Sequence, residues 1–505
     1  MAEAASPLPD AVRRVVIVGG GTTGWSAAAA LATAPGMGHL HVTLVETPDI
    51  PTIGVGEATI PHIRGFNAAI GLDEARFVAN TGATIKLGIR FDDWHRRGAR
   101  YFHPFGETVR RIGGVDPHHH LVRGQMTADD LAALSPGAVA AATGRVVDAS
   151  PPDPAMVERA DYAYHFDAGR YAPLLRDHAV ARGVVRVTGR VAGIRRAPAD
   201  GMVEAVLCDD GRAIAGDLFL DCSGFRGLLI GDAPDNRFVD WSHWLPCDRA
   251  VAAPCARLGE LVPFTRSTAD VAGWRWRIPL QHRTGNGHVY CSAFLDDTAA
   301  ADALLAAMDG PPLADPRVIP FRTGHRDRVW DGNVVALGLA AGFLEPLEST
   351  SIYLAQKGAL LLLDLFPGRQ GAGPLRDEYN RVMLDEFAQI RDFLVLHYSA
   401  TTRDDSAFWR ARRGMPPPDS LSARLALFEN HGVLWQHQRF FNEVSWRAVL
   451  IGQGIVPRGH DPRLDAVPED WARSAIAAAR AATRDWVARY AGHAETVAAI
   501  VGAAR

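Results

Sequence analysis

The sequence predicts an α/β protein that opens with a nucleotide-binding βαβ unit and closes with a layer of helices. The apolar, β-branched run at 15–18 reads as a strand, GGGTTG (19–24) as a tight turn, and the alanine-rich segment 25–32 as a helix. A second strand at 41–45 leads to Glu46, about 20 residues beyond the glycines, where a carboxylate can bind a ribose hydroxyl. The turn, the following helix and the acid together predict dinucleotide binding.

Two later glycine-containing segments refine this prediction. FLDCSGF (219–225) follows the pattern of a buried strand that ends in a glycine turn, and GNVVALGLAAG (332–342) repeats it with small residues that permit close backbone approach. Simple NAD-binding domains rarely need such additional segments. Three separated segments that meet at one nucleotide are expected of FAD-binding folds with a substrate sheet inserted between them.

The character of the sequence changes after PGRQGAGP (367–374), where long helical patterns begin. We expect helices at 375–398, 420–428 and 470–490. The sequence therefore predicts two parts: an FAD-binding module with an inserted substrate sheet at 1–366, and a helical module covering the substrate at 367–505.

Bulk composition points to small-molecule chemistry. With 48% hydrophobic residues and a formal charge of −4 over 505 residues, nothing favours nucleic acid or an anionic membrane as a partner. The five cysteines are dispersed and form no CxxC pair, which argues against disulfides and zinc and suits a reducing cytoplasm. We see no export signal, and the apolar run 358–366 is too short to span a bilayer. The run His118 to His120 predicts no metal site, because consecutive side chains diverge.

Two features call for a chemical explanation. Trp274 and Trp276 flank one residue in GWRWRIP (273–279), so both indoles lie on one face of a strand. Of the 53 basic residues, only Lys86 and Lys357 are lysine. Such a lysine either survives by chance among arginines or supplies an amine that arginine cannot replace.

Several motifs, in order along the chain, resemble the flavin-dependent halogenases of the tryptophan halogenase family. They are GGGTTG, GVGEATIP (54–61), the segment around Lys86, GWRWRIP and EPLESTS (345–351); TTRDDSAFWR (401–410) is also similar to that family. The resemblance implies a flavin-monooxygenase-like (GR2-type) fold, reduced FAD delivered by a separate NADH-dependent reductase, and a homodimer. It also implies that O₂ and chloride or bromide are converted to hypohalous acid, which halogenates an electron-rich aromatic carbon of indole type.

The resemblance assigns roles to individual residues. Lys86 matches the lysine that receives the oxidant, and Glu348 matches the catalytic glutamate, which would position the oxidant and accept the ring proton. The alternatives are a solvated lysine at a strand end and an acid that stabilises the start of a helix from Ser351. The positions implied to bind FAD are Gly19, Gly21, Thr22, Thr23, Gly24, Glu46, Gly54, Val55, Gly56, Glu57, Ala58, Gly338 and Ser349, those for halide are Thr350 and Ser351, and the flavin-shielding pair is Trp274 and Trp276.

The substrate pocket is where the resemblance weakens. His103 and Phe105 match residues that sandwich an indole, although a core histidine is an alternative. Tryptophan-specific members carry a YY…ExxxFW pattern, whereas this chain reads LWQHQRFF (434–441), with Trp435 and Phe440 as candidate pocket residues. Loss of the amino-acid clamp favours other indole-type aromatics or a larger substrate with its own anchor. An aromatic hydroxylase and a non-catalytic flavin-binding or aromatic-ligand-binding protein remain the alternative functions.

Overall fold

A six-stranded sheet holds the N-terminal βαβ unit in the computed structural model, which describes residues 11–47, 56–106, 111–147, 160–233, 235–368, 372–435 and 440–504. Its order is β20-β21-β12-β1-β2-β8, and all neighbouring pairs are parallel except β20 with β21. The strands are β1 (Arg14–Val18), β2 (His41–Glu46), β8 (Val185–Thr188), β12 (Leu218–Asp221), β20 (Trp330–Asp331) and β21 (Val334–Ala336). The run Val15 to Val18 is fully buried, as expected for a strand covered on both faces.

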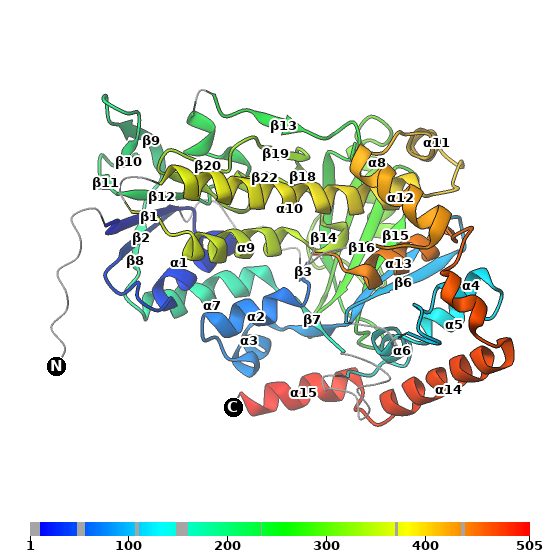
Figure 1. Ribbon diagram of the computed structural model, residues 1–505. Helices are drawn as coiled ribbons and strands as arrows, with labels where there is room; N and C mark the ends of the chain where they lie inside the picture. Colours follow the sequence, from blue (N-terminus) through cyan, green and yellow to red (C-terminus); the bar gives the residue numbers. More distant parts are fainter. Residues whose placement is uncertain are drawn as a thin grey trace.

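Helices cover this sheet. Helix α1 (Thr22–Thr33) packs against α7 (Ala168–Val180) and α9 (Ser351–Asp364), and α9 lies beside the long α10 (Gly373–Ser399) (Figure 1). Near α7 lie α2 (His62–Ala69) and α3 (Glu74–Thr81), with the short 3₁₀ turns Gly224–Arg226, Ile230–Asp232, Gly338–Ala340 and Pro346–Glu348 at strand ends. The strand, turn and helix predicted at 15–32 are thus confirmed.

A seven-stranded sheet forms the second layer, in the order β18-β14-β17-β16-β15-β5-β6. Its strands are β5 (Gly88–Asp92), β6 (Arg100–Pro104), β14 (Arg249–Cys255), β15 (Thr265–Ala269), β16 (Gly273–Pro279), β17 (Thr284–Tyr290) and β18 (Arg317–Pro320), and α8 (Asp297–Ala306) packs on β14 and β17. Three-stranded sheets complete the β structure: β3 (Glu57–Ala58), β4 (Thr84–Lys86) and β7 (Ala163–Phe166); β9 (Val191–Arg196), β10 (Val203–Cys208) and β11 (Ala213–Ala215); β13 (Phe238–Asp240), β19 (Gly324–Arg326) and β22 (Gly342–Phe343).

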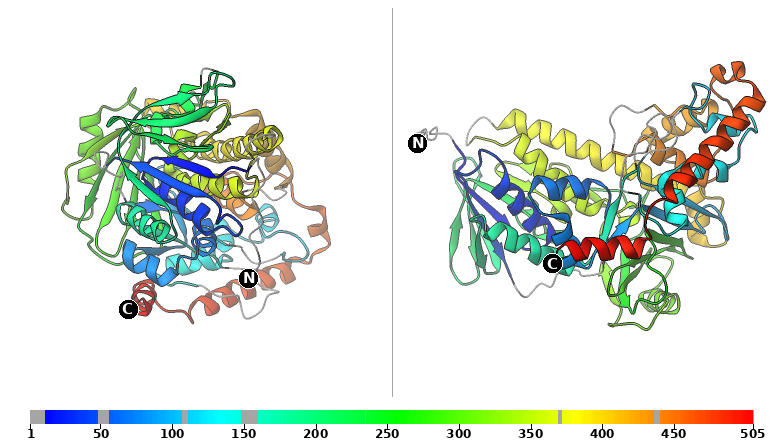
Figure 2. Two further views of the ribbon diagram at one scale, coloured as in Figure 1. Left: turned by 90° about the vertical axis from the view of Figure 1, so that its left-hand side faces the viewer. Right: turned by 90° about the horizontal axis from the view of Figure 1, so that it is seen from below.

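The C-terminal part of the described chain is helical from α10 onward, as predicted. It continues through α11 (Ala407–Arg413), α12 (Asp419–His431), α13 (Glu443–Gly452), the 3₁₀ turn Pro462–Ala466, α14 (Glu469–Val487) and α15 (His493–Ala503). Helix α14 packs on α6 (Pro136–Ala142), which follows α4 (His119–Val122) and α5 (Ala128–Ala132), and α15 returns to α3. The two last helices therefore run along one side of the molecule (Figure 2).

Helices α10 and α13 pack the C-terminal part against α9 and β6. Helix α10 packs against α9, α11, α12 and α13, and α13 packs against β6, which carries His103.

Among the described residues, no helix is long and apolar enough to cross a membrane. The run 358–366 belongs mostly to α9, in agreement with the prediction of a buried helix. The division at residue 366 into two modules stays a prediction.

Candidate functional site

A cavity of about 610 Å³ lies where the carboxyl end of β1 meets the start of α1. The three glycine segments predicted to meet at one nucleotide all line it, together with the two tryptophans of β16. The predicted residues among its lining are Gly19, Gly21, Thr22, Thr23, Glu46, Gly56, Glu57, Ala58, Trp274, Trp276, Gly338, Ser349 and Ser351. Gly24 is absent from the lining but supports the turn, and Gly54 and Val55 lie outside the described residues.

The glycines allow backbone segments to approach each other at this cavity. A Cβ at Gly24 would lie 1.8 Å from the Gly19 carbonyl oxygen, and one at Gly338 would lie 2.5 Å from Thr23 Oγ1. Gly338 also has φ 60°, a left-handed conformation that favours glycine. The close approach leaves the N–H groups at the start of α1 beside an open cavity, which suits a pyrophosphate.

Glu46 provides the acid at the end of β2. Its Oε2 accepts from the Trp25 indole Nε1 at 3.1 Å and its Oε1 accepts from Arg186 Nε at 2.5 Å. These contacts hold the carboxylate at the cavity wall, where the fold places a ribose. The residues present therefore fit FAD.

A short segment connects this cavity to Lys86. Gly56 has φ 76°, and Glu57 and Ala58 form β3 against β7. Burial raises the pKa of the Glu57 carboxyl to about 7. The next residue, Thr59, is buried and its carbonyl oxygen accepts a hydrogen bond from Lys86 Nζ at 2.8 Å.

Lys86 is completely buried, which excludes the solvated lysine considered as the alternative. It is the last residue of β4 and pairs with Ala163 of β7. Its Nζ donates to the Thr59 carbonyl and to Ser349 Oγ at 2.9 Å, and it lies 5.0 Å from the centre of the Phe105 ring. Burial lowers the pKa of Lys86 to about 7, although the nearby Glu348 carboxylate opposes this shift.

Glu348 lies beside Lys86 and is paired with two histidines. His103 Nδ1 lies 2.9 Å from Oε2 and 3.2 Å from Oε1, and His397 Nε2 lies 3.0 Å from Oε1. Burial raises the pKa of Glu348, but the charge and hydrogen bonds of His103 and His397 outweigh it and lower the pKa to about 2. Glu348 is thus held as a carboxylate. Glu348 ends a 3₁₀ turn that precedes α9, and the alternative of an acid that stabilises the start of this helix stays open.

His397 is a site residue that the sequence did not reveal. It lies on α10, 49 positions beyond Glu348, in no motif, so its contact with the carboxylate depends on helix packing. Its Nδ1 lies 2.8 Å from the Phe393 carbonyl oxygen, which can only accept, so Nδ1 carries a proton.

The residues after Glu348 adopt an unusual backbone. Ser349 has φ 61° and ψ 37°, a left-handed conformation that costs energy in a residue other than glycine. This conformation places its hydroxyl on Lys86 and its surface on the cavity. Thr350 Oγ1 and Ser351 Oγ are buried without a hydrogen-bond partner in the described structure. Both positions therefore offer polar groups, and their assignment to halide stays a prediction.

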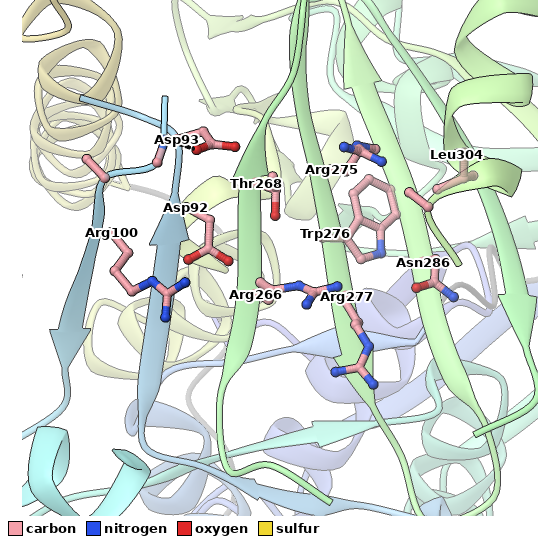
Figure 3. Close-up of a pocket in the computed structure, with 13 residues that line it drawn as sticks. Asp92, Asp93, Arg100, Arg266, Thr268, Arg275, Trp276, Arg277, Asn286 and Leu304 are labelled. Atoms are coloured by element: carbon pink, nitrogen blue, oxygen red, sulfur yellow. Dashed lines mark hydrogen bonds between the residues drawn. The ribbon is translucent and has the colours of Figure 1, made fainter. Parts of the chain in front are cut away.

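Trp274 and Trp276 lie on the same face of β16, as predicted, and both are buried at the cavity. Arg275 and Arg277 line a polar pocket of about 310 Å³, and Trp276 also borders this pocket (Figure 3). Arg275 Nε contacts Asp270 at 2.7 Å. Trp274 therefore lines the flavin cavity, whereas Trp276 borders both the flavin cavity and the polar pocket.

Aromatic residues surround the buried His103. Phe105 and Phe441 are both buried, and their ring centres lie 6.5 Å and 6.4 Å from that of His103. Phe441 also stacks on Phe393, with 3.8 Å between the ring centres. Phe441, which the sequence did not single out, is therefore part of the buried aromatic cluster around His103.

Phe440 and Trp435, the two predicted pocket residues of LWQHQRFF, have different surroundings in the structure. Phe440 stacks on Tyr353 at 4.1 Å and touches Phe441 at 4.5 Å. Trp435 is 69% exposed and is not brought to His103, and residues 436–439 lie outside the described residues.

No metal-binding group of histidine, cysteine and acidic side chains occurs in the described parts of the chain. The rings of His118 and His119 lie 4.2 Å apart, so these two side chains do not diverge, but the three histidines have separate partners: His118 contacts the Gly432 carbonyl, His119 the Asp461 N–H and His120 the Gln125 side chain. All five cysteines are buried and free.

Comparisons with known proteins agree with this geometry. The family model described as tryptophan halogenase matches residues 14–469. The chain is 35% identical to 7-chloro-L-tryptophan 6-halogenase KtzR of Kutzneria sp. (strain 744), covering 92% of this chain and 95% of that protein. Among solved structures, a flavin-dependent halogenase from Xanthomonas campestris has a TM-score of 0.92 at 44% identity, covering 97% of this chain and 98% of that one.

A second solved structure gives the same result. The flavin-dependent halogenase BrvH from Brevundimonas sp. BAL3 superposes with a TM-score of 0.91 at 45% identity, covering 97% of this chain and 99% of that one. Both structural matches cover 97% of this chain. The chain belongs to the tryptophan halogenase family of flavin-dependent halogenases.

Proposed function

We propose that Lys86 and Glu348 form the halogenation site of this enzyme and that an indole-type aromatic ring binds beside them. The enzyme is an FAD-dependent halogenase that uses chloride or bromide and receives reduced flavin from a separate reductase. The observation that carries the residue assignment is the position of Lys86 Nζ, which bridges Thr59 and Ser349 at the edge of the cavity with Glu348 alongside.

Lys86 holds the oxidant. Reduced FAD, when bound, supplies with O₂ and halide the hypohalous acid that the chain then directs. Two of the three N–H donors of the Lys86 ammonium are occupied by Thr59 and Ser349, so the third can donate to the oxygen of hypohalous acid. Because the side chain is wholly buried, water does not compete for that hydrogen bond.

Glu348 completes the substitution. The aromatic carbon forms its bond to the halogen as the bond between halogen and oxygen breaks. The leaving hydroxide takes a proton from the Lys86 ammonium to become water, and the ring proton passes to a Glu348 oxygen, from which it can return to Lys86. A carboxylate with a pKa of about 2 is a weak base, but the protonated ring intermediate is a strong acid, so a weak base suffices. His103 and His397 keep this carboxylate in place and ionised.

The substrate proposed is an indole-type ring without a required amino-acid group. His103, Phe105 and Phe441 supply aromatic surfaces near Glu348, which suits stacking on an electron-rich ring. No described residue of 434–441 supplies an acid to pair an ammonium group. A larger substrate that brings its own anchor is the alternative to a free indole.

The test is mass spectrometry of products formed by the purified enzyme with FAD, a flavin reductase, NADH and O₂. An indole panel that includes tryptophan is run with chloride and with bromide. Halogenated indoles with little halogenated tryptophan are expected. Hydroxylated product without halogen would instead indicate an aromatic hydroxylase.

We further propose a homodimer in the cytoplasm, which light scattering and cell fractionation would check.

A further inference from the structure

The two buried carboxyl groups of EPLE (345–348) show how strongly histidine contacts act on Glu348. Glu345 is 0% exposed and Glu348 is 1% exposed. Glu345 Oε1 accepts a hydrogen bond from the Tyr398 hydroxyl at 2.7 Å, and burial raises the pKa of this carboxyl to about 7. Glu348, which contacts His103 and His397, instead has a pKa of about 2. The ionised state of Glu348 therefore depends on how closely its histidines are held.

The two histidines belong to separate elements of the fold. His103 lies on β6, and His397 lies in the last turn of α10. The His397 ring is tied to its own helix through Nδ1 and the Phe393 carbonyl oxygen, so the ring follows the position of this helix end. Helix α13 packs against both β6 and α10. It is thus placed to fix one histidine relative to the other.

Helix α13 ends in GQG (452–454), where the two glycines have separate structural tasks. Gly454 has φ 80°, and the N–H groups of Gly454 and Ile455 donate back to carbonyls in the last turn of α13, both at 2.9 Å. This pair of bonds is a Schellman ending, which favours glycine at its left-handed position. A Cβ at Gly452 would lie 2.4 Å from Cγ of Tyr101, so glycine lets the helix end approach β6. The backbone of Gln453 is fixed between them.

The side chain of Gln453 joins α10 to β6. Gln453 is 1% exposed, and its Nε2 donates to the His397 carbonyl oxygen at 3.0 Å and to Tyr101 Oη at 3.3 Å. A reversed amide would set two acceptor oxygens against each other at His397, so the donor assignment follows from the carbonyl. Carbonyls in the last turn of a helix have no N–H partner within the helix. Gln453 supplies a donor at the residue whose ring contacts Glu348.

The other end of this link lies next to His103. Tyr101 precedes His103 by two positions in β6, so their side chains lie on the same face of the strand. The Tyr101 ring stacks on Phe91 with 4.8 Å between the centres, and Phe91 lies 4.8 Å from the His397 ring. The group that anchors Gln453 is therefore packed among the rings around the two histidines.

We propose that Gln453 is a positioning residue that holds the His397 ring at Glu348 by tying the end of α10 to Tyr101 of β6. Gln453 makes no hydrogen bond to Glu348 or Lys86 in the part of the chain that the structure describes, so it acts through His397. The consequence for catalysis rests on the proposed function, in which Glu348 accepts the ring proton.

The test uses Gln453→Met, which keeps the length of the side chain and removes both N–H donors. The readouts are kcat and KM for the aromatic substrate, with O₂ consumption measured alongside. We expect kcat for halogenation to fall about tenfold, with KM and O₂ consumption within twofold of wild type. The matched control is Gln356→Met, because Gln356 is another buried glutamine whose Nε2 donates to a tyrosine, Tyr171, at 3.4 Å. A wild-type kcat in Gln453→Met, or an equal loss in Gln356→Met, would overturn the proposal.

A double-mutant comparison shows whether the effect passes through His397. In a His397→Leu background the ring that Gln453 positions is already missing. Gln453→Met should then lower kcat by less than a further twofold. A full tenfold loss in that background would show that Gln453 acts by another route and would refute the assigned role.

A spectroscopic measurement separates the proposal from the halogenase assignment. The ¹³Cε1–H signal of the His397 ring, identified by its absence in His397→Leu, should move in Gln453→Met while the signal of the buried His325 stays. If Gln453→Met does not fold, the same signal is followed in Gln453→Glu, which keeps the shape and polarity of the side chain but removes its amide nitrogen. An unmoved His397 signal would refute the link even in an active halogenase. A moved signal in an enzyme that yields no halogenated product would count against the proposed function alone.

Discussion

The Nε2 atom of His397 lies 3.0 Å from Oε1 of Glu348, and the Nδ1 atom of the same ring donates to the backbone of its own helix at 2.8 Å. Helix α10 therefore places a buried histidine directly beside the Glu348 carboxylate.

Replacing His397 with leucine should make halogenation sensitive to acid. Loss of His397 should raise the pKa of Glu348, because burial raises this pKa and one of the two histidines that lower it is then missing. The carboxylate is needed ionised, so the rate should be lost as pH falls through the raised pKa. We expect the acid limb of the pH–kcat profile to move up by about one pH unit or more. An unchanged profile would contradict this role. His325→Leu, which removes a buried histidine of β19, is the control.

Lys86→Ala should abolish halogenated product while FAD binding and O₂ consumption persist. The reason is that Lys86 Nζ donates to Ser349, which lines the cavity, whereas the glycine turn that suits FAD lies in a separate part of the cavity lining. Product is measured by mass spectrometry and O₂ by electrode. Lys357→Ala is a matched control, because it removes the other lysine of the chain. Product formed by Lys86→Ala at near wild-type rate would exclude the assigned role.

Glu348→Gln should slow halogenation by roughly 10² to 10⁴, the scale of losing a general base. Glutamine keeps the size of the side chain but cannot take the ring proton. Single-turnover rates with a pre-formed oxidant measure this step directly. Glu386→Gln should leave the rate unchanged, since that glutamate pairs with Tyr353. A Glu348→Gln rate equal to wild type would remove the carboxylate from the mechanism.

The buried ammonium of Lys86 should make stability depend on pH. Its pKa falls from the ordinary 10.5 to about 7 on folding, so between these values the unfolded chain binds the extra proton. The free energy of unfolding should therefore rise with pH in this window, by at most about 1.4 kcal/mol per pH unit from this group. Urea unfolding of wild type and Lys86→Met at pH 6, 8 and 9 checks this. As pH rises, the free energy of unfolding of wild type should increase relative to that of Lys86→Met. A difference between the two that does not depend on pH would refute the lowered pKa.

Gly24→Ala should weaken FAD binding strongly. The added Cβ would lie 1.8 Å from the Gly19 carbonyl oxygen, a backbone atom that cannot move without opening the turn. Titration of the apoprotein monitored by flavin fluorescence measures the loss. Gly38→Ala is the control, because nothing lies within 4 Å of a Cβ there. Wild-type affinity in Gly24→Ala would show that the turn tolerates the displacement.

Much of this architecture could be predicted from the amino-acid sequence. Local patterns such as the β-branched run at 15–18, the glycine turn and Glu46 determine a βαβ unit, because strand, turn and helix depend on neighbouring residues. The alternation in GWRWRIP likewise placed both indoles on one face of β16. Lys86 and Glu348 were identified through motifs that resemble a known family, and folding brings them together although 262 positions separate them.

Contacts between distant helices could not be read from such patterns. His397 and Tyr398 lie in an ordinary helical stretch, and only the packing of α10 beside the EPLE turn pairs them with Glu348 and Glu345. For the same reason Phe441, rather than Trp435, lies near His103. The protonation of the two acids follows from these contacts, because burial and neighbouring donors, which spacing does not encode, set the pKa of a carboxyl group.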